Sequence, residues 1–352
     1  MKGYAIEGVN QASWRDGLPQ PEARYGEVVV KPVVVAPCTS DVHILETMAF
    51  PTMKGKPMGH EMAGIVHEVG PGVRDFKVGD RVAVPSLTVD WGDPQFQDGY
   101  DKYASVSPYF SEDPRLLGCF AEYFLVMGAD LNLAHIPDAV TWEQAVVLTD
   151  MGTTAFEGVH WLDLDYGQSV VVYGIGAVGL MAVRAAYLKG AGRLFAIGSR
   201  EVSFEIAREF GASDLVNYRD GDVAEQVLAR NGGPVDAVVV CGGSDISAIA
   251  DAMKMVRFGG HVTNVAVFMH DKQFVLPNEL WAFGSQDKTL RSVSCRGGRA
   301  NLERLLKLAE YGRVAPERLA THTYHGMEHI EKALAQMGGH DRTAIKPVVF
   351  FD

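Results

Sequence analysis

Two short segments near the start of the sequence carry side chains that could bind a metal ion. Residues 37–43 contain Cys38, and residues 58–64 contain His60 with Glu61 beside it. A thiol and an imidazole are sulfur and nitrogen donors of the kind that Zn²⁺ prefers. Considered alone, one Cys and one His are more often a small buried apolar residue and a hydrogen-bonded core histidine. The choice between a metal site and ordinary packing therefore depends on the neighbouring residues.

The neighbours of His60 form a spaced pattern of glycines. The segment reads Gly59-His60-Glu61, followed by Gly64, Gly70 and Val73. This pattern closely resembles the zinc signature of the medium-chain alcohol dehydrogenases. The resemblance favours zinc ligation over ordinary packing for both Cys38 and His60.

The same resemblance implies a third zinc ligand at Asp150, where the chain leaves its first domain. The family often has Cys at this point, but Zn²⁺ also accepts carboxylate oxygen. The chain is most similar to the bacterial NADP-dependent secondary alcohol dehydrogenases, which use a Cys, His, Asp set with an adjacent Glu. The expected metal site is therefore Cys38, His60 and Asp150, with Glu61 able to join it. Spacing alone would make Asp150 a solvated residue at a helix end.

Residues near Cys38 match the positions of a proton relay in the resembling family. In that relay a hydroxyl at the position of Ser40 passes the substrate proton, through the cofactor ribose, to an imidazole at the position of His43. An ordinary exposed histidine is an equally good interpretation of His43 without the resemblance. Asp41 is interpreted as a structural residue or as a partner of a metal ligand.

A dinucleotide-binding motif begins at residue 169. The β-branched run Ser169–Tyr173 leads into Gly174-x-Gly176-x-x-Gly179, and a helix is predicted over 180–189. Between a strand and a helix, such glycines allow a tight turn and let a pyrophosphate approach the helix N-terminus. The expected contacts with the cofactor come from Gly174, Gly176, Ala177, Val178 and Gly179.

The residues after the next predicted strand indicate which dinucleotide is bound. Enzymes that use NAD commonly place an Asp or Glu there for the ribose 2′-hydroxyl, whereas this chain has Gly198-Ser199-Arg200. Glycine leaves room, serine can donate a hydrogen bond, and arginine can pair with a 2′-phosphate. The resemblance adds Tyr218, which matches a phosphate-contacting position. The sequence therefore predicts NADP(H).

The elements that must position these groups follow from the sequence pattern. Residues 1–84 contain short apolar runs broken by Gly and Pro, for example 27–31 and 33–36, which are predicted as strands of a β-rich, barrel-like region. Residues 90–115 are polar and aromatic and predict a long loop lobe. Thr141 and Gln144 form a capping box that predicts a helix from 142. From 169 to 267 strands alternate with helices, the last strand being predicted over 261–267, as in a Rossmann-type parallel sheet.

These patterns and the resemblance together predict an α/β protein. A GroES-like β-rich catalytic domain is expected over 1–153 and a doubly wound NADP-binding Rossmann domain over 154–294. The C-terminal segment, 295–352, is expected to return to the catalytic domain.

Composition restricts the class of partner. The chain has 352 residues, 47% of them hydrophobic and 22% charged, with a formal net charge of −12. The negative charge of the chain disfavours binding to nucleic acid or to anionic membranes. The sequence contains no apolar run long enough to predict a membrane span. Four cysteines without a Cys-x-x-Cys pair suit a reducing cytoplasm. The lobe that holds a structural zinc in many relatives contains only Cys119, so one catalytic zinc and no structural zinc are expected.

The function implied by the resemblance is interconversion of secondary alcohols and ketones, and of some aldehydes, with NADP(H). Zinc would lower the pKa of the alcohol oxygen while hydride passes to the nicotinamide. A polyol or threonine dehydrogenase is the first alternative, and a zinc-free NADPH-binding quinone-reductase-like or lens-crystallin-like protein is the second. Relatives with this set of motifs are commonly homotetramers. Ser86, Val267 and Ser294 stand where relatives commonly line the alcohol pocket and depart from their pattern, so the resemblance alone does not predict the preferred substrate.

Overall fold

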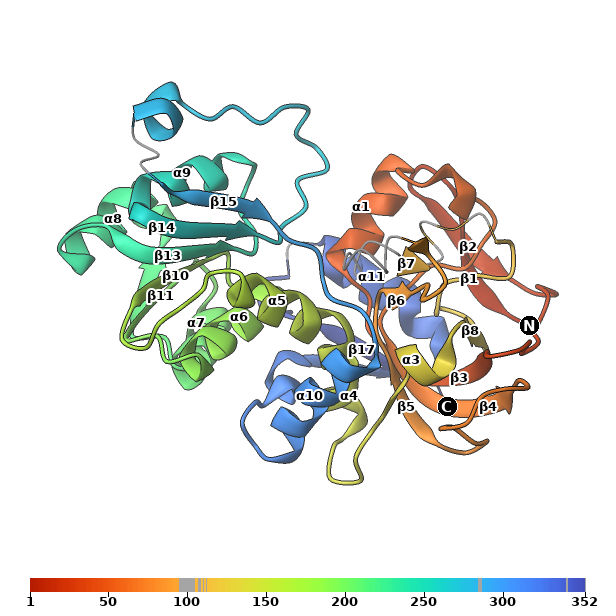
Figure 1. Cartoon of the computed structure of the whole chain (residues 1–352). Coiled ribbons are helices and arrows are strands. Elements are labelled where there is room, and N and C mark those ends of the chain that lie inside the picture. Colours follow the sequence, from red (N-terminus) through yellow and green to blue (C-terminus); the bar gives the residue numbers. More distant parts are fainter. Residues whose placement is uncertain are drawn as a thin grey trace. The chain divides into compact units, whose positions relative to one another are not determined.

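The computed structural model describes residues 1–94, 105–106, 109, 111, 113–283, 287–339 and 341–351. The chain forms two compact units, one made of Met1–Thr153 with Arg296–Asp352 and the other of Thr154–Cys295 (Figure 1). Much of the predicted loop lobe over 90–115 is outside the described residues, including its aromatic residues Phe96, Tyr100, Tyr103 and Phe110.

The first unit is built on a seven-stranded sheet in the order β16-β17-β3-β4-β5-β9, with β8 also paired to β3. Its strands are β3 (Val28–Val35), β4 (Met62–Val69), β5 (Arg81–Val84), β8 (Phe124–Val126), β9 (Ala134–His135), β16 (His322–His325) and β17 (Pro347–Phe350). Strands from both ends of the chain meet in this sheet, because β17 pairs antiparallel with β3. Two smaller sheets join β1 (Gly3–Gly8) to β2 (Gln11–Arg15) and β6 (Thr88–Val89) to β7 (Ser105–Val106).

Strand β3 differs from the sequence prediction, which expected two strands, 27–31 and 33–36. It is continuous from Val28 to Val35, and its register against β4 shifts between Pro32 and Val34. Proline lacks the N–H that a ladder needs, so the irregularity lies where the sequence suggested a break. The strand survives because its valines are buried on the sheet.

Helices of the first unit follow from local signals and from packing. They are α1 (Thr39–Thr47), α3 (Ala129–Asn132), α4 (Trp142–Val147), α10 (Arg299–Glu310) and α11 (Ile330–Gly338), with short turns η1 (Pro51–Met53), η5 (Pro316–Leu319) and η6 (Met327–His329). The capping box is confirmed: the Gln144 N–H donates to Thr141 Oγ1 at 3.2 Å, and the Thr141 N–H donates to Gln144 Oε1 at 3.0 Å. A π-helical turn, η2 (Leu148–Gly152), follows α4 and leads into α5 (Thr153–His160).

The second unit is a six-stranded parallel sheet in the order β12-β11-β10-β13-β14-β15. Its strands are β10 (Ser169–Tyr173), β11 (Arg193–Gly198), β12 (Asp214–Asn217), β13 (Val235–Val240), β14 (Val256–Asn264) and β15 (Thr289–Ser292). The helices are α6 (Ala177–Leu188), α7 (Glu201–Glu209), α8 (Val223–Asn231) and α9 (Ser247–Met255), with turns η3 (Tyr218–Asp220) and η4 (Glu279–Phe283). Figure 1 shows α8 and α9 on one face of this sheet and α6 and α7 on the other. The strand order reverses beside β10, as in a doubly wound dinucleotide-binding fold.

Two boundaries in the second unit differ from the prediction. Helix α6 starts at Ala177 rather than Leu180, so it begins inside the glycine motif. Strand β14 starts at Val256, directly after α9, whereas the sequence predicted a strand from His261. The register between Val235 and Ala237 of β13 shifts at this point, so Gly259 and Gly260 interrupt the pairing without ending the strand. Among the described residues, no helix combines the length and apolar character that a membrane span requires.

Candidate metal centre and cofactor-binding loop

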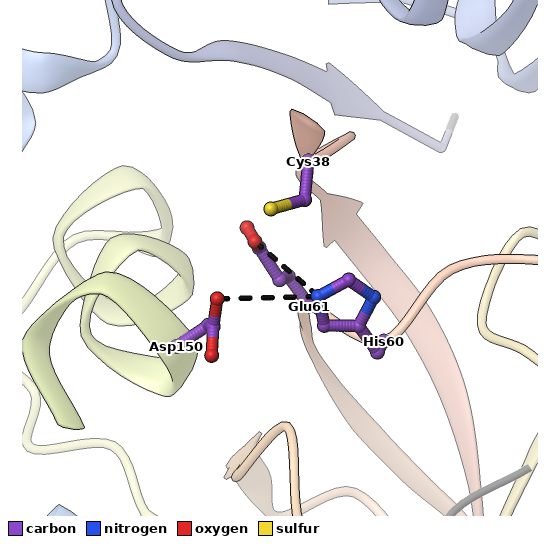
Figure 2. Close-up of side chains that lie close together, drawn as sticks. All are labelled: Cys38, His60, Glu61 and Asp150. Carbon is purple, nitrogen blue, oxygen red and sulfur yellow. Dashed lines mark ion pairs between the residues drawn. The ribbon is translucent and has the colours of Figure 1, made fainter. Parts of the chain in front are cut away.

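Four potential metal ligands converge in the first unit. One donor atom each from Cys38, His60, Glu61 and Asp150 lies within 4.8 Å of the other three (Figure 2). His60 Nε2 is 3.7 Å from Glu61 Oε1 and 3.9 Å from Asp150 Oδ2. The sequence placed these four residues in one site, and the structure brings them together.

The ligand candidates come from three separate parts of the first unit. Cys38 follows β3 and stands at the N-terminus of α1. His60 and Glu61 precede β4, the neighbour of β3 in the sheet. Asp150 lies in the π-helical turn η2, a rare form of helix that is frequent at functional sites.

The carboxylate of Asp41 fixes the orientation of His60. Asp41 is fully buried, and its Oδ1 lies 3.0 Å from His60 Nδ1. Its other oxygen, Oδ2, accepts a hydrogen bond from the Cys38 N–H at 2.9 Å. Burial would lower the pKa of His60, but the charge and hydrogen bond of Asp41 raise it well above its ordinary value. With Nδ1–H directed at Asp41, the Nε2 lone pair is available to a metal. The sequence had allowed this role for Asp41.

Tyr109 is a further supporting residue, and the sequence gave no signal for its role. Its hydroxyl donates to Asp41 Oδ1 at 2.7 Å and accepts from the Gly59 N–H at 2.9 Å. The ring is buried and lies edge-on to the His60 imidazole. Tyr109 therefore ties the backbone before His60 to the carboxylate that orients it.

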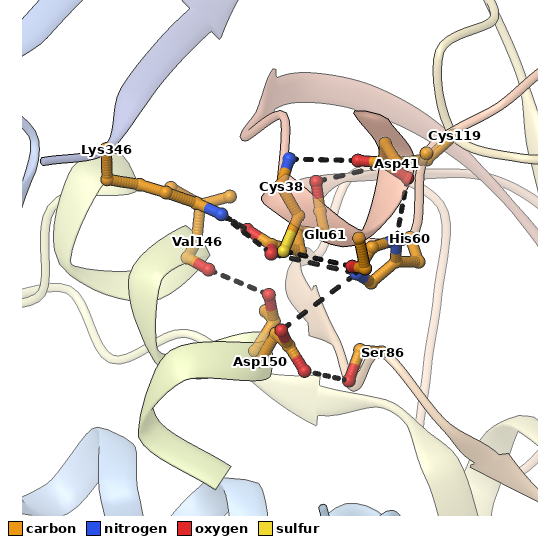
Figure 3. A network of polar contacts seen from close by, with 12 residues as sticks. Cys38, Asp41, His60, Glu61, Ser86, Cys119, Val146, Asp150 and Lys346 are labelled. Atoms are coloured by element: carbon orange, nitrogen blue, oxygen red, sulfur yellow. Dashed lines mark hydrogen bonds and ion pairs between the residues drawn. The ribbon is translucent and has the colours of Figure 1, made fainter. Parts of the chain in front are cut away.

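Asp150 is held by Ser86. The Ser86 hydroxyl donates to Asp150 Oδ1 at 2.8 Å, which leaves Oδ2 as the oxygen nearer His60 (Figure 3). The sequence had considered Ser86 only as a residue of the substrate pocket. Its contact with Asp150 makes it a partner of a ligand candidate.

A buried lysine stands beside Glu61, and sequence reasoning missed it. Lys346 Nζ donates to Glu61 Oε1 at 2.7 Å and lies 2.7 Å from Oε2, with 1% of the lysine side chain exposed (Figure 3). Burial would lower the pKa of Lys346, but Cys38, Glu61 and Asp150 outweigh it and raise the pKa. In the sequence this lysine stands among apolar residues, in Ile345-Lys346-Pro347-Val348, and no motif there indicates a functional site.

The glycine motif of the second unit has the shape of a pyrophosphate cradle. Gly174 has φ of +86°, and a Cβ on Gly179 would lie 2.0 Å from the Gly174 carbonyl oxygen. These two positions require glycine, for a turn and for close packing of helix on strand. At Gly176 a Cβ would meet no heavy atom within 4 Å, so space remains beside the backbone. Ala177 and Val178 form the first residues of α6, whose free N–H groups suit an anion.

The predicted 2′-phosphate residues gather at the ends of two adjacent strands. Gly198 ends β11 and Tyr218 follows β12, its neighbour. The Ser199 hydroxyl donates to the Tyr218 hydroxyl at 2.7 Å. Arg200 is half-buried at the N-terminus of α7. This end of the two strands therefore presents two hydroxyls and a guanidinium, and no carboxylate at positions 198–200.

Comparison with known proteins identifies the family of the chain. Residues 24–138 match the alcohol dehydrogenase GroES-like domain, and residues 177–310 match the zinc-binding dehydrogenase family. The chain is 41% identical to the NADP-dependent isopropanol dehydrogenase of Thermoanaerobacter brockii over 99% of both chains. It belongs to the zinc-containing medium-chain alcohol dehydrogenase family. The family predicted from the two motifs is thus confirmed.

Other members of this alcohol dehydrogenase family give the same result. The NADP-dependent isopropanol dehydrogenase of Clostridium beijerinckii is 40% identical over 99% of both chains. The solved structure of an alcohol dehydrogenase from Thermus sp. ATN1 matches all of both chains with a TM-score of 0.87 at 26% identity. The predicted fold class, a GroES-like domain with a Rossmann domain, is confirmed.

The donor set fits the zinc of a medium-chain alcohol dehydrogenase. Donors about 2.0–2.3 Å from a tetrahedral Zn²⁺ lie roughly 3.3–3.8 Å apart, close to the distances at His60. Burial would raise the pKa of Cys38, but the charges of Lys346 and His60 lower it to about 7, which favours the thiolate that binds metal. Glu61 Oε2 is a buried oxygen that accepts no well-aligned hydrogen bond from the described residues. Its nearest cation is the Lys346 ammonium group, 2.7 Å away, and its lone pairs could also face a metal ion.

The two relay candidates of this alcohol dehydrogenase have different surroundings. Ser40 Oγ donates to Cys38 Sγ at 3.1 Å and lies 3.5 Å from His60 Nε2, so it borders the metal site. His43 lies on α1 with 27% of its side chain exposed, and its Nδ1 is 3.3 Å from Glu46 Oε2. Of the remaining pocket candidates, Val267 is 66% exposed and Ser294 is exposed.

Proposed function

We propose that this chain is an NADP-dependent secondary alcohol dehydrogenase, which interconverts secondary alcohols and ketones. The observation that carries the proposal is the convergence of Cys38, His60, Glu61 and Asp150 in one largely enclosed site. A zinc-free relative would not need such a set. The two relatives named as isopropanol dehydrogenases support a small secondary alcohol as substrate.

Cys38, His60 and Asp150 are the residues that would hold Zn²⁺, with Glu61 as an additional ligand. Asp41 keeps the His60 ring in place, and Ser86 does the same for the Asp150 carboxylate. The chemistry that the bound groups would supply is polarisation of the substrate oxygen by zinc and exchange of hydride with the nicotinamide.

Ser40 is the residue that handles the substrate proton in this proposal. Its hydroxyl borders both Cys38 and His60, so it can hydrogen-bond to an oxygen placed near the metal. His43 is partly exposed on the same helix and can exchange a proton with water. Geometry near the metal supports Ser40 more directly than it supports His43.

The second unit would bind NADP(H) through the glycine loop and the ends of β11 and β12. The space beside Gly176 and the N-terminus of α6 would receive the pyrophosphate. Ser199, Arg200 and Tyr218 would bind the 2′-phosphate by two hydroxyls and a guanidinium.

The proposal also covers the domain boundaries and the assembly of the protein. We assign residues 1–153 and 295–352 to the catalytic domain and 154–294 to the NADP-binding domain. The assembly is proposed to be a homotetramer in the cytoplasm, with one catalytic zinc and no structural zinc in each subunit.

The test combines metal analysis with steady-state kinetics. The purified chain should contain about one zinc per subunit and oxidise NADPH with small ketones such as acetone, more efficiently than it oxidises NADH. Removal of zinc by a chelator should abolish activity, and added Zn²⁺ should restore it. A metal-free chain that retains full activity would contradict the proposal, and a preference for diols or polyols would favour the first alternative.

A further inference from the structure

Lys346 is a charge buried within the proposed metal site. Its side chain is 1% exposed, and it stands directly before β17, on the C-terminal segment of the first unit. Its ammonium group lies 2.7 Å from both oxygens of Glu61. Burial of a lysine is costly unless the charge is paired, so this contact requires a reason.

Charge balance provides the first part of the reason. Cys38 as thiolate, Glu61 and Asp150 are three anionic donors in a buried space, and they exceed the charge of Zn²⁺ by one. The ammonium group of Lys346 supplies the missing positive charge. With Lys346 present, the loaded site is neutral whether Glu61 faces the metal or the lysine.

The other ligand candidates have hydrogen-bonding partners of a different kind. Nδ1 of His60 pairs with Asp41, and the hydroxyls of Ser86 and Ser40 donate to Asp150 Oδ1 and to Cys38 Sγ. Glu61 differs, because a full positive charge lies within contact distance of both its oxygens. A metal must therefore compete with Lys346 for the Glu61 carboxylate.

The number of ligands that zinc accepts explains why competition for Glu61 would help the substrate to bind. A catalytic zinc site commonly has three protein ligands and a fourth position for substrate or water. Cys38, His60, Asp150 and Glu61 together would fill a tetrahedral site. The substrate oxygen can then enter only where Glu61 is displaced or held away.

We propose that Lys346 is a positioning residue that makes Glu61 an exchangeable ligand. It receives the Glu61 carboxylate when the fourth position opens to the substrate oxygen, and it keeps the site neutral during the exchange. This inference rests on the proposed zinc site, and it goes beyond that site by assigning a function to the C-terminal segment.

The test uses the Co²⁺-substituted protein and imidazole as an added ligand for the fourth position. Imidazole binds metal as its neutral base, which predominates at about pH 8, and its binding changes the visible absorption of Co²⁺, so affinity is measured without catalysis. In Lys346→Met the carboxylate has no competing cation and should stay on the metal. Loss of a charge-assisted hydrogen bond should then weaken imidazole binding by about tenfold or more and slow the release of metal to a chelator.

Two further variants separate this exchange from a general disturbance. The double variant Lys346→Met with Glu61→Gln should recover most of the imidazole affinity, because an amide competes poorly with imidazole for the metal. Lys332→Met, on α11 of the same unit, removes an exposed lysine and should leave imidazole binding unchanged.

The result that would overturn the inference is wild-type imidazole affinity in Lys346→Met, or a loss that persists in the double variant. Should Lys346→Met not fold, Lys346→Gln takes its place with the same expected loss of imidazole affinity, because a neutral amide also leaves the Glu61 carboxylate without a competing cation. Wild-type affinity in Lys346→Gln would overturn the inference while leaving the zinc site intact. A wild-type chain that binds neither Co²⁺ nor Zn²⁺ would overturn the proposed function as well.

Discussion

Oδ1 of Asp41 lies 3.0 Å from Nδ1 of His60, and Asp41 is completely buried. Asp41 belongs to the first turn of α1 and also accepts a hydrogen bond from the Cys38 N–H. One carboxylate thus fixes the segments that carry two ligand candidates. The metal site is organised by a residue that does not itself face the metal.

Replacement of Asp41 by Asn should weaken zinc binding, because an amide can no longer accept the Nδ1 proton with a full negative charge. Loss of such a partner typically costs 10–100-fold in metal affinity, and we expect about that range here. Competition with a chromophoric chelator measures it. The exposed Asp16→Asn is the matched control. Zinc affinity in Asp41→Asn equal to that of the control would show that His60 is oriented by other contacts.

Removal of the Tyr109 hydroxyl should act through Asp41. Tyr109→Phe leaves Asp41 Oδ1 with one donor fewer and leaves the Gly59 N–H without its partner. An unsatisfied buried group costs about 1–3 kcal/mol, so the free energy of unfolding should fall by roughly that amount. Denaturant unfolding measures the change, and zinc affinity should decrease in parallel. Unchanged stability and zinc affinity would remove Tyr109 from the supporting contacts.

The sequence predicted the elements of the second unit well because their signals are local. The β-branched strand, the glycine turn and the helix each depend on neighbouring residues, and the observed β10 and α6 follow that pattern. Boundaries shifted where context decides, as at β14, which continues across Gly259 and Gly260 because pairing with β13 resumes after them. The same locality explains the capping box at Thr141.

The metal site shows what local sequence signals cannot contain. Cys38, His60 and Glu61 lie close in sequence, so their proximity could be inferred from the motif. Lys346 is 285 residues from Glu61, and its place depends on the pairing of β17 with β3. The contacts of Tyr109 and Ser86 also join distant segments. Such partners follow from sheet topology, which a single sequence does not specify.

Ser40→Ala should lower kcat far more than it changes KM for NADPH, because the hydroxyl borders the metal site rather than the cofactor loop. Positioned proton transfer contributes typically 10²–10⁴-fold, and a loss of about that size is expected. His43→Ala should lose less, since water can replace a partly exposed imidazole. Steady-state kinetics with a ketone and NADPH distinguishes the two. Wild-type turnover in Ser40→Ala would exclude its proposed role.

Stability of the second unit should depend on pH through Asp214. Arg193 donates to both oxygens of Asp214 at 2.9 Å, and this hydrogen bonding lowers the pKa of the carboxyl group. The contribution is therefore complete above the unfolded pKa, near ~3.9, and is lost as the pH falls through the lower folded value.

The corresponding variant is Asp214→Asn. It should lower the free energy of unfolding at pH 7 by roughly 0.2–1 kcal/mol, because the pair is partly exposed. The difference from wild type should be constant down to about pH 5 and should shrink below about pH 4. Urea unfolding across this range, with the exposed Asp220→Asn as control, measures it. A difference that grows toward low pH would contradict the assignment.

Cofactor preference should depend on Arg200. Introducing an NAD-type carboxylate at Gly198 is a poor test, because a Cβ there would lie 2.4 Å from Cγ1 of Ile175. Arg200→Ala avoids this clash and removes only the guanidinium. Loss of its charge-assisted bond should lower kcat/KM for NADPH by about tenfold or more and change that for NADH much less, since NADH has no 2′-phosphate. Arg208→Ala, on the exposed side of the same helix, should leave both values unchanged. Equal use of NADH and NADPH by the wild type would show that Arg200 points to solvent, and the assignment of NADP would then fail while the dinucleotide fold remained.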